Sequence, residues 1–321
     1  MVAMKIVYIT GCLGFMGSHL TEECLKLGWK VYGVDNCSYA ANLEMIDEFN
    51  KYQNFKFIKS DICDLNYLND CDYVINTAAE SHVANSIVDN DVFVKTNILG
   101  VKRLLDLVKS KQRGAVDSPI FFHFSTDEVY GDIVSGQFTE NDLLHPSNPY
   151  SASKAAADML VLAWARTYDL KYVILRPTNN YGIRQYQEKL IPIIVRNINW
   201  GKKIKLHDEG EPIRTWLHAH DTAMGVIKII ESGACNEIFN ISGGFEQKNI
   251  ETVKQVVHHY FEGKENYNLE EFLDRTYKRP GQDVRYSIDD SKLRNLGWEP
   301  KKVFSEEIGS IVAYYKEYLK W

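Results

Sequence analysis

The stretch Thr10-Gly11-Cys12-Leu13-Gly14-Phe15-Met16-Gly17-Ser18-His19 follows an apolar run at residues 6–9 and opens a segment of helical periodicity. Three glycines at this spacing, between a strand and a helix, predict a loop that binds a dinucleotide. Gly11 allows the tight turn, Gly14 lets the backbone approach a pyrophosphate, and Gly17 lets the helix pack close to the strand. The free N–H groups and the positive dipole end of the helix N-terminus favour the phosphates.

Acidic residues end the next two predicted strands. Asp35 ends the strand at residues 30–35, about twenty residues after the glycines, where a carboxylate accepts from adenosine ribose hydroxyls. A carboxylate there would repel a 2′-phosphate, so the sequence favours NAD over NADP. Asp61-Ile62 closes the third strand, where an acid would meet the adenine amino group, and a helix-capping role for Asp61 is the alternative.

The first half of the chain alternates short β-rich runs with longer helical patterns. We expect strands at residues 5–10, 30–35, 55–61, 73–77, 120–125 and 172–176, and helices at residues 15–27, 43–52, 91–111 and 150–168. Most of these strands are unbroken apolar runs, which is typical of a parallel sheet covered on both faces. The repetition of strand, helix and strand predicts an α/β fold with a doubly wound parallel Rossmann sheet.

After Pro177 the alternation of predicted strands and helices becomes less regular. Helical stretches follow near residues 189–200, 250–261 and 305–319. We expect residues 1–178 to form the dinucleotide-binding domain, together with a return segment near residues 213–243. Residues 179–321 would form a smaller C-terminal α+β domain for the substrate.

Composition narrows the class of protein. Apolar residues make up 45% of the 321 residues and charged residues 25%, which excludes a disordered chain. The net charge of −6, without a basic block, argues against nucleic acid or anionic membrane as a partner. No apolar run approaches the ~20 residues that span a bilayer, and no signal peptide is expected. The six cysteines form no Cys-x-x-Cys pair, so we expect free thiols, no zinc site and a cytoplasmic location.

The segment at residues 152–165 is apolar nearly all round, from Ala155 to Ala165. A helix without a polar face is buried on every side. Composition alone leaves two explanations open, which are coverage by a second subunit and deep burial within one chain.

Two further clusters could carry chemistry. Tyr150 and Lys154 lie at i, i+4 on a predicted helix, where an ammonium would lower the pKa of the phenol and make it a usable base.

Thr126, Asp127 and Glu128 end the fifth predicted strand, at the sheet edge where ligands of open α/β sheets bind. They offer a hydrogen-bond donor and two carboxyls for acid–base work. The alternative is a helix N-cap followed by first-turn acids.

With these residues the sequence resembles the extended short-chain dehydrogenase/reductase family, and within it the dTDP-glucose 4,6-dehydratases. The glycine motif and Tyr-x-x-x-Lys are shared by the superfamily. More specific are the stretches at residues 78–83, 125–131, 149–154, 179–182, 188–192, 214–217 and 279–283. The resemblance covers nearly the whole chain, and the Thr-Asp-Glu triplet matters most because epimerases usually carry another triplet there.

The resemblance implies a reaction. Tyr150, assisted by Lys154, would take the proton of the sugar 4-hydroxyl while C4 gives hydride to NAD, and Thr126 would hydrogen-bond the oxygen at C4. Glu128 would remove the C5 proton and Asp127 in its acid form would protonate the departing 6-hydroxyl. Return of the hydride to C6 gives a 4-keto-6-deoxy nucleotide sugar, a precursor type in deoxysugar biosynthesis such as that of rhamnose.

The resemblance also implies two sets of binding residues and a homodimer that pairs residues 152–165 with residues 91–111. The cofactor, NAD, would contact Gly11, Gly14, Phe15, Met16, Gly17, Asp35, Asn36, Asp61, Ile62, Ala78, Ala79, Thr96, Tyr150, Lys154 and Asn180. The nucleotide diphospho-sugar would contact Ser81, Thr126, Asn179, Lys189, Leu190, Arg214, Asn249 and Arg279. Arg214 and Arg279 suit a diphosphate because guanidinium pairs bidentately with phosphate oxygens.

The sequence departs from the family at Gln282, where thymidine-type enzymes usually have His, and at Cys12-Leu13, where small residues are common. The first departure leaves dTDP-glucose and UDP-glucose both open as substrates. His218-x-His220 and His258-His259 lack acidic or Cys partners at convincing spacing, and we expect no metal. The alternatives are a UDP-glucose 4-epimerase, a UDP-glucuronate decarboxylase, or a non-catalytic NAD-binding module on the same fold.

Overall fold

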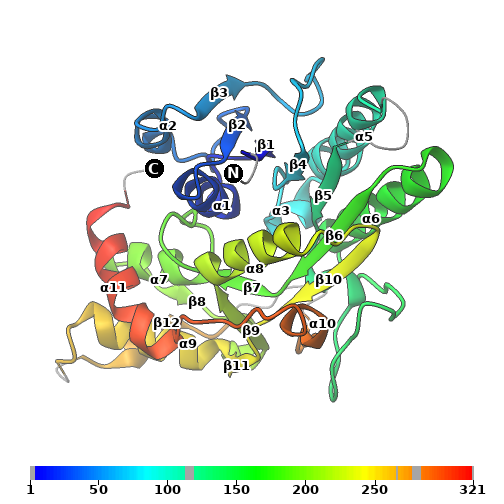
Figure 1. Cartoon of the computed structure of the whole chain (residues 1–321). Coiled ribbons are helices and arrows are strands. Elements are labelled where there is room, and N and C mark those ends of the chain that lie inside the picture. Colours follow the sequence, from blue (N-terminus) through cyan, green and yellow to red (C-terminus); the bar gives the residue numbers. More distant parts are fainter. Residues whose placement is uncertain (1–3, 113–118, 265–266, 277–282, 320–321) are drawn as a thin grey trace.

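The structure is a computed structural model that describes residues 4–112, 119–264, 267–276 and 283–319 (Figure 1). Within these ranges, seven strands form one sheet in the order β10-β6-β5-β4-β1-β2-β3, and every neighbouring pair is parallel. The strands are β1 (Ile6–Thr10), β2 (Lys30–Asp35), β3 (Phe55–Lys59), β4 (Tyr73–Asn76), β5 (Ile120–Phe124), β6 (Tyr172–Pro177) and β10 (Glu237–Ile241). The predicted doubly wound parallel sheet is confirmed.

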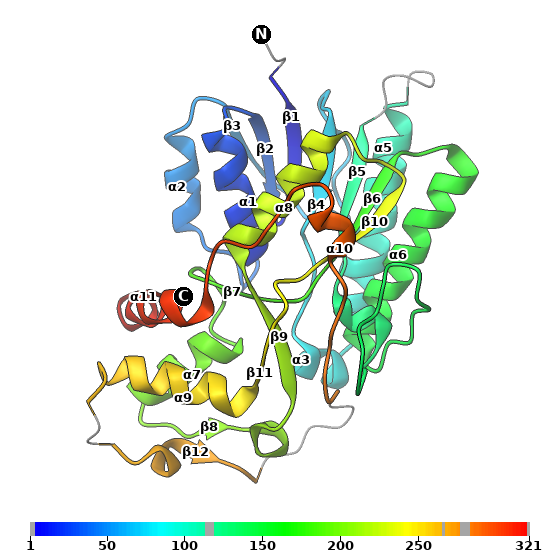
Figure 2. The same cartoon turned by 60° about the horizontal axis from the view of Figure 1, so that its bottom comes forward.

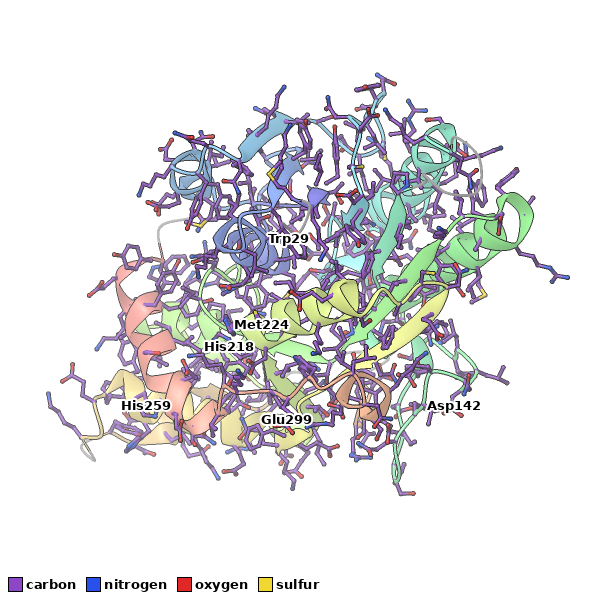
Figure 3. All side chains as sticks on the ribbon, viewed as in Figure 1. Trp29, Asp142, His218, Met224, His259 and Glu299 are labelled. Carbon is purple, nitrogen blue, oxygen red and sulfur yellow. The ribbon has the colours of Figure 1, made fainter. Side chains whose placement is uncertain are left out.

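Helices cover both faces of this sheet (Figure 2). On one face lie α1 (Phe15–Lys26), α2 (Glu44–Asn50) and α8 (Ala219–Ser232), which bury Val7 and Ile9 of β1. Trp29 and Met224, labelled in Figure 3, belong to this core. On the other face α5 (Val101–Ser110) and α6 (Pro149–Tyr168) bury Tyr8 of the same strand. Successive residues of a strand point to opposite faces, so an unbroken apolar strand supplies both cores.

The smaller part of the molecule lies at the carboxyl ends of the parallel strands (Figure 2). Its strands are β7 (Asn179–Tyr181), β9 (Ile213–His218) and β11 (Phe245–Lys248) in one sheet and β8 (Ile204–Lys205) with β12 (Leu273–Asp274) in another. Its helices are α7 (Leu190–Asn199), α9 (Asn249–Tyr260) and α11 (Phe304–Glu317), and they share a separate apolar core. Short turns complete it at η3 (His207–Gly210), η4 (Leu269–Phe272) and α10 (Ser291–Arg294).

The return segment differs from the prediction for residues 213–243. Only β10 joins the large sheet, where it pairs with β6, whereas β9 pairs with β7 and β11. Between them runs α8, whose first turn is capped by the side chain of His218. The physical reason is helical periodicity at residues 219–232, which buries Ala223, Val226 and Ile230 at positions i, i+3 and i+7.

The helix predicted at residues 91–111 is confirmed as a continuous run over residues 91–110, but it contains a π-helical segment, and a short helix that was not predicted precedes it. The structure has α3 (Val83–Val88), α4 (Asp91–Phe93), a π-helix η1 (Val94–Gly100) and then α5. A π-helical turn inserts an extra residue into a helix and occurs often at functional sites. At its end, a Cβ on Gly100 would lie 2.5 Å from Ile62 Cδ1, so the helix approaches the β3–β4 connection closely. In the described part of the chain, no helix is long and apolar enough to cross a lipid bilayer.

Candidate active site

The glycine-rich loop forms a cradle of backbone at the N-terminus of α1. Gly11 has φ +69° and donates its N–H to Val34 O at 2.7 Å. A Cβ on Gly17 would lie 2.0 Å from Gly11 O, and a Cβ on Gly11 would lie 2.8 Å from Ala78. Both positions therefore require glycine, and the helix terminus stays open for a phosphate group.

The carboxylates that follow the second and third strands hold the adjoining loops. Asp35 accepts hydrogen bonds from the N–H groups of Leu13 at 3.0 Å and Cys37 at 2.8 Å. Burial raises the pKa of Asp35, and these two bonds oppose it. Asp61 accepts from Asn36 Nδ2 at 3.2 Å and from Cys63 N at 2.9 Å, so its loop-capping role is real. An ionised carboxylate has about four acceptor sites, so both groups keep capacity for a ligand.

A cavity of about 100 Å³ opens between these loops. It is lined by most of the residues predicted for the adenosine end, namely Gly11, Gly14, Asp35, Asn36, Asp61, Ile62, Ala78, Ala79 and Thr96. A second cavity of about 270 Å³ continues from the glycine loop and is lined by Phe15, Met16, Gly17, Tyr150, Lys154 and Asn180. The structure thus brings together every residue predicted to bind the cofactor, and the donor set fits a dinucleotide.

Thr126, Asp127 and Glu128 line that second cavity, together with Tyr150 and Lys154. Thr126 follows β5 and caps the 3-10 turn η2 (Asp127–Tyr130), because its Oγ1 accepts from Glu128 N at 3.3 Å. It also donates to Asp127 Oδ1 at 3.2 Å. The capping alternative is therefore confirmed, and it is compatible with the functional interpretation, because both capped residues line the cavity.

The two carboxyls have different environments. Asp127 is 2% exposed, and burial followed by the charge of Glu128 raises its pKa to about 7. Burial also raises the pKa of Glu128, while Arg214 and Lys189 oppose the rise. Asn148 Nδ2 donates to Glu128 Oε2 at 3.5 Å. Asp127 can therefore carry a proton near neutrality beside a second carboxyl, which is the pairing that acid–base chemistry needs.

Tyr150 and Lys154 lie at the start of α6, where Asn148 and Ser151 form a capping box. Lys154 Nζ donates to Phe124 O at 2.5 Å, and burial lowers the lysine pKa to about 8. The pKa of Tyr150 is raised, first by burial and then by Glu128. The net direction is thus opposite to the lowering expected from the Tyr-x-x-x-Lys spacing, because burial disfavours the charged phenolate.

The third cavity, of about 710 Å³, extends from Glu128 into the smaller part of the molecule. It is lined by six of the residues predicted for the substrate, namely Ser81, Asn179, Lys189, Leu190, Arg214 and Asn249. Lys189 Nζ donates to Ser81 O at 2.8 Å and so joins the two parts of the molecule. Asn179 Nδ2 and Asn249 Oδ1 are buried without a hydrogen-bond partner among the described residues, which suits a polar ligand. Arg279 and Gln282 lie outside the described residues.

Sequence reasoning missed Tyr286 as a site residue. It lines the third cavity beside Glu128, and the Arg214 guanidinium lies 4.6 Å from the centre of its ring. Arg214 Nη2 also donates to Asp283 O at 3.2 Å. Residues 279–283 carry one of the motifs of the resemblance. The position of Tyr286, three residues after this motif, is the sequence feature that could have indicated it as a site residue. His218, which belongs to the His218-x-His220 pattern and is labelled in Figure 3, has a structural contact: its ring packs edge-on against Tyr181.

Comparison with known proteins decides the family. A family model described as GDP-mannose 4,6 dehydratase matches residues 8–311. The chain belongs to this family. Within it, a dTDP-glucose 4,6-dehydratase from Haemophilus influenzae is 38% identical, and the match covers 97% of this chain and 98% of the relative. The resemblance inferred from the sequence motifs is confirmed.

Solved structures of dehydratases and epimerases have the same fold as this chain. A crystal structure of the dTDP-glucose 4,6-dehydratase from Streptomyces venezuelae, with NAD bound, has a TM-score of 0.89 and 33% identity, covering 98% of this chain and 97% of that one. A UDP-glucose 4-epimerase from Thermotoga maritima has a TM-score of 0.84 and 27% identity, covering 98% of this chain and all of its own. The fold is thus shared with epimerases, and the chemistry has to be argued from the site.

Proposed function

We propose that this protein uses NAD to convert a nucleotide-activated glucose, dTDP-glucose or UDP-glucose, to the 4-keto-6-deoxy nucleotide sugar with loss of water. The observation that carries the proposal is the adjacency of two carboxyls, the buried Asp127 and the half-buried Glu128, in the cavity that Tyr150 and Lys154 also line. Elimination of a hydroxyl beside a ketone needs one base and one acid, and this pair can supply both.

The protein's residues take the following roles. NAD, when bound, supplies the acceptor for the C4 hydride and later the donor to C6. Tyr150 takes the proton of the 4-hydroxyl, and Thr126 hydrogen-bonds the oxygen at C4. Glu128 removes the C5 proton that the 4-ketone has acidified, and Asp127 protonates the departing 6-hydroxyl. Glu128 then returns its proton to C5 as hydride adds to C6. The pKa of Asp127, about 7, supports its role as the acid.

The linings of the three cavities assign the binding residues for the cofactor and the substrate. The predicted cofactor set, from Gly11 to Asn180, holds the dinucleotide, and Asp35 favours NAD over NADP. The predicted substrate set lines the third cavity, where Arg214 serves the diphosphate. We assign Arg279 to the same group by its motif, and residues 1–178 and 179–321 to the cofactor and substrate domains.

The epimerase and decarboxylase alternatives share the fold, NAD and a nucleotide sugar. Neither reaction eliminates the 6-hydroxyl, and neither needs both an acid and a base at C5 and C6. The intact pair of Asp127 and Glu128 therefore favours dehydration, as do the dehydratase names of the relatives. The same intact residues argue against a non-catalytic module.

We also propose a homodimer. The outer stripe of α6 leaves Ala152, Met159 and Ala163 exposed on one face, with Met159 49% exposed. Beside it, Val92 and Leu99 are 40% and 55% exposed. Exposed apolar side chains on neighbouring helices can form an interface, and a second copy of the chain would cover them. Free thiols at all six cysteines support a reducing compartment, so we place the protein in the cytoplasm.

A substrate panel tests the function. The purified protein is incubated with dTDP-glucose, UDP-glucose and GDP-mannose, and the products are weighed by mass spectrometry. We expect one glucose nucleotide to lose one water. Formation of UDP-galactose at unchanged mass would contradict the proposal. Comparison of the rates with dTDP-glucose and UDP-glucose gives the preferred nucleotide.

A further inference from the structure

Tyr39 and Glu80 form a hydrogen bond between the two loops that flank the glycine loop. Tyr39 lies in the loop at residues 36–43, after β2, and Glu80 lies in the loop at residues 77–82, after β4. The Tyr39 hydroxyl donates to Glu80 Oε2 at 3.1 Å. In the sheet, β1 lies between β2 and β4, so the two loops stand on either side of the glycine loop that follows β1. The hydrogen bond therefore joins the two sides of the cofactor groove.

This hydrogen bond stands at the junction of the two cavities assigned to the cofactor. Both cavities, of about 100 Å³ and about 270 Å³, are lined by residues of all three loops, namely Gly11, Gly14, Ser38, Ala40, Thr77, Ala79 and Glu80. Tyr39 lines the larger cavity and is flanked in the chain by Ser38 and Ala40, which line both. A dinucleotide that occupies both cavities has to pass this junction.

The backbone of Glu80 is held in place from the sheet side of the groove. Asn97 Oδ1 accepts from Glu80 N at 2.9 Å, and Asn97 Nδ2 donates to Glu80 O at 3.0 Å. The same Nδ2 donates to Ser153 Oγ on α6 at 2.8 Å. Asn97 belongs to η1 and has no exposed surface. Tyr39, in contrast, is 48% exposed, so we expect the Tyr39 side of the hydrogen bond to be the one that moves.

A contact with the smaller part of the molecule supports Tyr39. Its ring packs edge-on against the ring of Tyr186, with ring centres 5.2 Å apart. Tyr186 lies in the loop at residues 182–189, between β7 and α7, and also lines the larger cofactor cavity. At the end of that loop, Lys189 donates to the carbonyl of Ser81, the neighbour of Glu80. Loops from both parts of the molecule thus meet at Tyr39 and Glu80.

We propose that Tyr39 and Glu80, supported by Tyr186, form a bridge over the cofactor that has to open for NAD to enter or leave. The inference rests on NAD as the cofactor and on no particular nucleotide sugar. Because the proposed reaction regenerates NAD in each turnover, slow release of NAD would not limit the reaction. Burial, then the charges of Glu188 and Glu80, raise the pKa of Tyr39, so its hydroxyl stays protonated near neutrality and can donate.

The test measures release of NAD from the holoenzyme. The protein is loaded with ¹⁴C-labelled NAD, an excess of unlabelled NAD is added, and the label that stays bound is followed over time by rapid gel filtration. Tyr39→Phe removes only the hydroxyl, and we expect release to be about 3- to 10-fold faster, which is the effect of losing one partly exposed hydrogen bond. Tyr39→Ala also removes the ring that packs against Tyr186, so we expect a larger increase.

A bridge limits entry as well as exit. We therefore expect the binding rate of NAD to rise in Tyr39→Ala together with the release rate. Binding is followed by tryptophan fluorescence, with the full chain from which charcoal has removed the cofactor. A side chain that only contacts bound NAD would leave the binding rate unchanged and weaken the affinity by the same factor as release accelerates. That result would overturn the bridge.

Tyr318 provides the matched control. It is 45% exposed, and its ring stacks on Tyr314 with ring centres 4.9 Å apart, so it is also a partly exposed member of a ring pair. It lines none of the three cavities. We expect Tyr318→Phe and Tyr318→Ala to bind and release NAD at the wild-type rates. Since Tyr39 and Tyr318 are both about half exposed, substitution at either leaves the core intact.

The bridge and the proposed reaction can fail separately. A wild-type release rate in Tyr39→Ala overturns the inference, whether or not the protein dehydrates a nucleotide sugar. Faster entry and exit of NAD in a variant of a protein that dehydrates neither glucose nucleotide would uphold the bridge and refute the proposed function.

Discussion

The Tyr286 hydroxyl lies 3.4 Å from Glu128 Oε2. The same hydroxyl is hydrogen-bonded to Asp283, whose Oδ2 also accepts from Ser147 Oγ at 2.6 Å. One phenol is thus shared between two carboxyls, and Arg214 covers its ring. The orientation of Glu128, which we assign as the C5 base, therefore depends on a residue of the smaller part of the molecule.

Replacing Tyr286 by Phe keeps the ring under Arg214 and removes the hydroxyl. Loss of a hydrogen bond to a charged group costs about 1.5–3 kcal/mol, so we expect kcat to fall by roughly 10- to 100-fold. Ser147→Ala is the control, since it takes one donor from Asp283 and leaves the Tyr286–Glu128 pair intact. Full activity of Tyr286→Phe in a coupled assay of the keto product would exclude the role.

Glu128→Gln tests the base itself. The amide keeps the shape of the side chain but cannot accept the C5 proton, and general base catalysis contributes typically 10²–10⁴-fold, so we expect a loss of roughly that size. NAD content, measured in the purified protein by chromatography after denaturation, should not change. Glu299→Gln is the matched control, because Glu299, labelled in Figure 3, is exposed and lines none of the three cavities. Dehydration at the wild-type rate by Glu128→Gln would remove Glu128 from the mechanism.

Protonation of Asp127 should affect both the activity and the stability of the protein. Its pKa of about 7 in the folded state exceeds the usual value, so the folded state binds this proton more tightly than the unfolded one. The resulting stability is complete below pH ~4 and is lost as the pH rises through about 7. Activity needs the protonated acid and the ionised Glu128, so kcat/KM should be bell-shaped, with its basic limb near the pKa of Asp127.

Asp127→Asn imitates the protonated carboxyl permanently. We expect the variant to lose dehydration and to unfold at a higher temperature than the wild type at pH 8, with a smaller difference at pH 5. The gain at pH 8 is at most about 4 kcal/mol, from roughly three units of pKa difference. Asp142→Asn is the control, since Thr139 lowers the pKa of that exposed carboxyl (Figure 3). A stability difference for Asp127→Asn that does not vary with pH would contradict the pKa assignment.

Gly17→Ala tests the backbone cradle. The added Cβ would lie 2.0 Å from Gly11 O, so the loop has to move. We expect loss of bound NAD and a fall in the free energy of unfolding of about 1–3 kcal/mol. Gly201→Ala is the control, because an alanine is strained at its φ of +61° but nothing lies within 4 Å of the new Cβ. Retention of NAD by Gly17→Ala in thermal unfolding with and without added NAD would count against the cradle.

The sequence predicts those features that local chemistry determines. The glycine loop, the parallel strands and the strand-end residues Asp35 and Asp127 follow from turn geometry and from two-sided burial. These features place the three cavities, since the carboxyl ends of parallel strands share one edge. Residues far apart in sequence, such as Ser81 and Lys189, could be brought together only through the resemblance, because no local rule fixes their contact.

The features that sequence reasoning missed depend on tertiary surroundings. The pKa of Tyr150 rises because the phenol is buried beside Glu128, and burial depth cannot be read from a Tyr-x-x-x-Lys spacing. Helix α8 lies in a stretch expected to return to the sheet, where apolar β-branched residues fit both structures. The π-helix η1 ends at Gly100, which packs closely against Ile62, and such a contact with another element is not specified by local sequence.

The exposed apolar side chains of α6 predict that this surface forms the interface of a homodimer. Met159 and Leu99 are 49% and 55% exposed on neighbouring helices, and a second copy would bury both. Met159→Asp combined with Leu99→Asp places four charges in a two-fold interface, so we expect a monomer by light scattering at micromolar concentration. Leu27→Asp is the control, since Leu27 is 47% exposed after α1, away from this stripe, and its variant should keep the wild-type mass. If the wild type itself scatters as a monomer, or if the double variant stays dimeric, the α6 surface is not the interface.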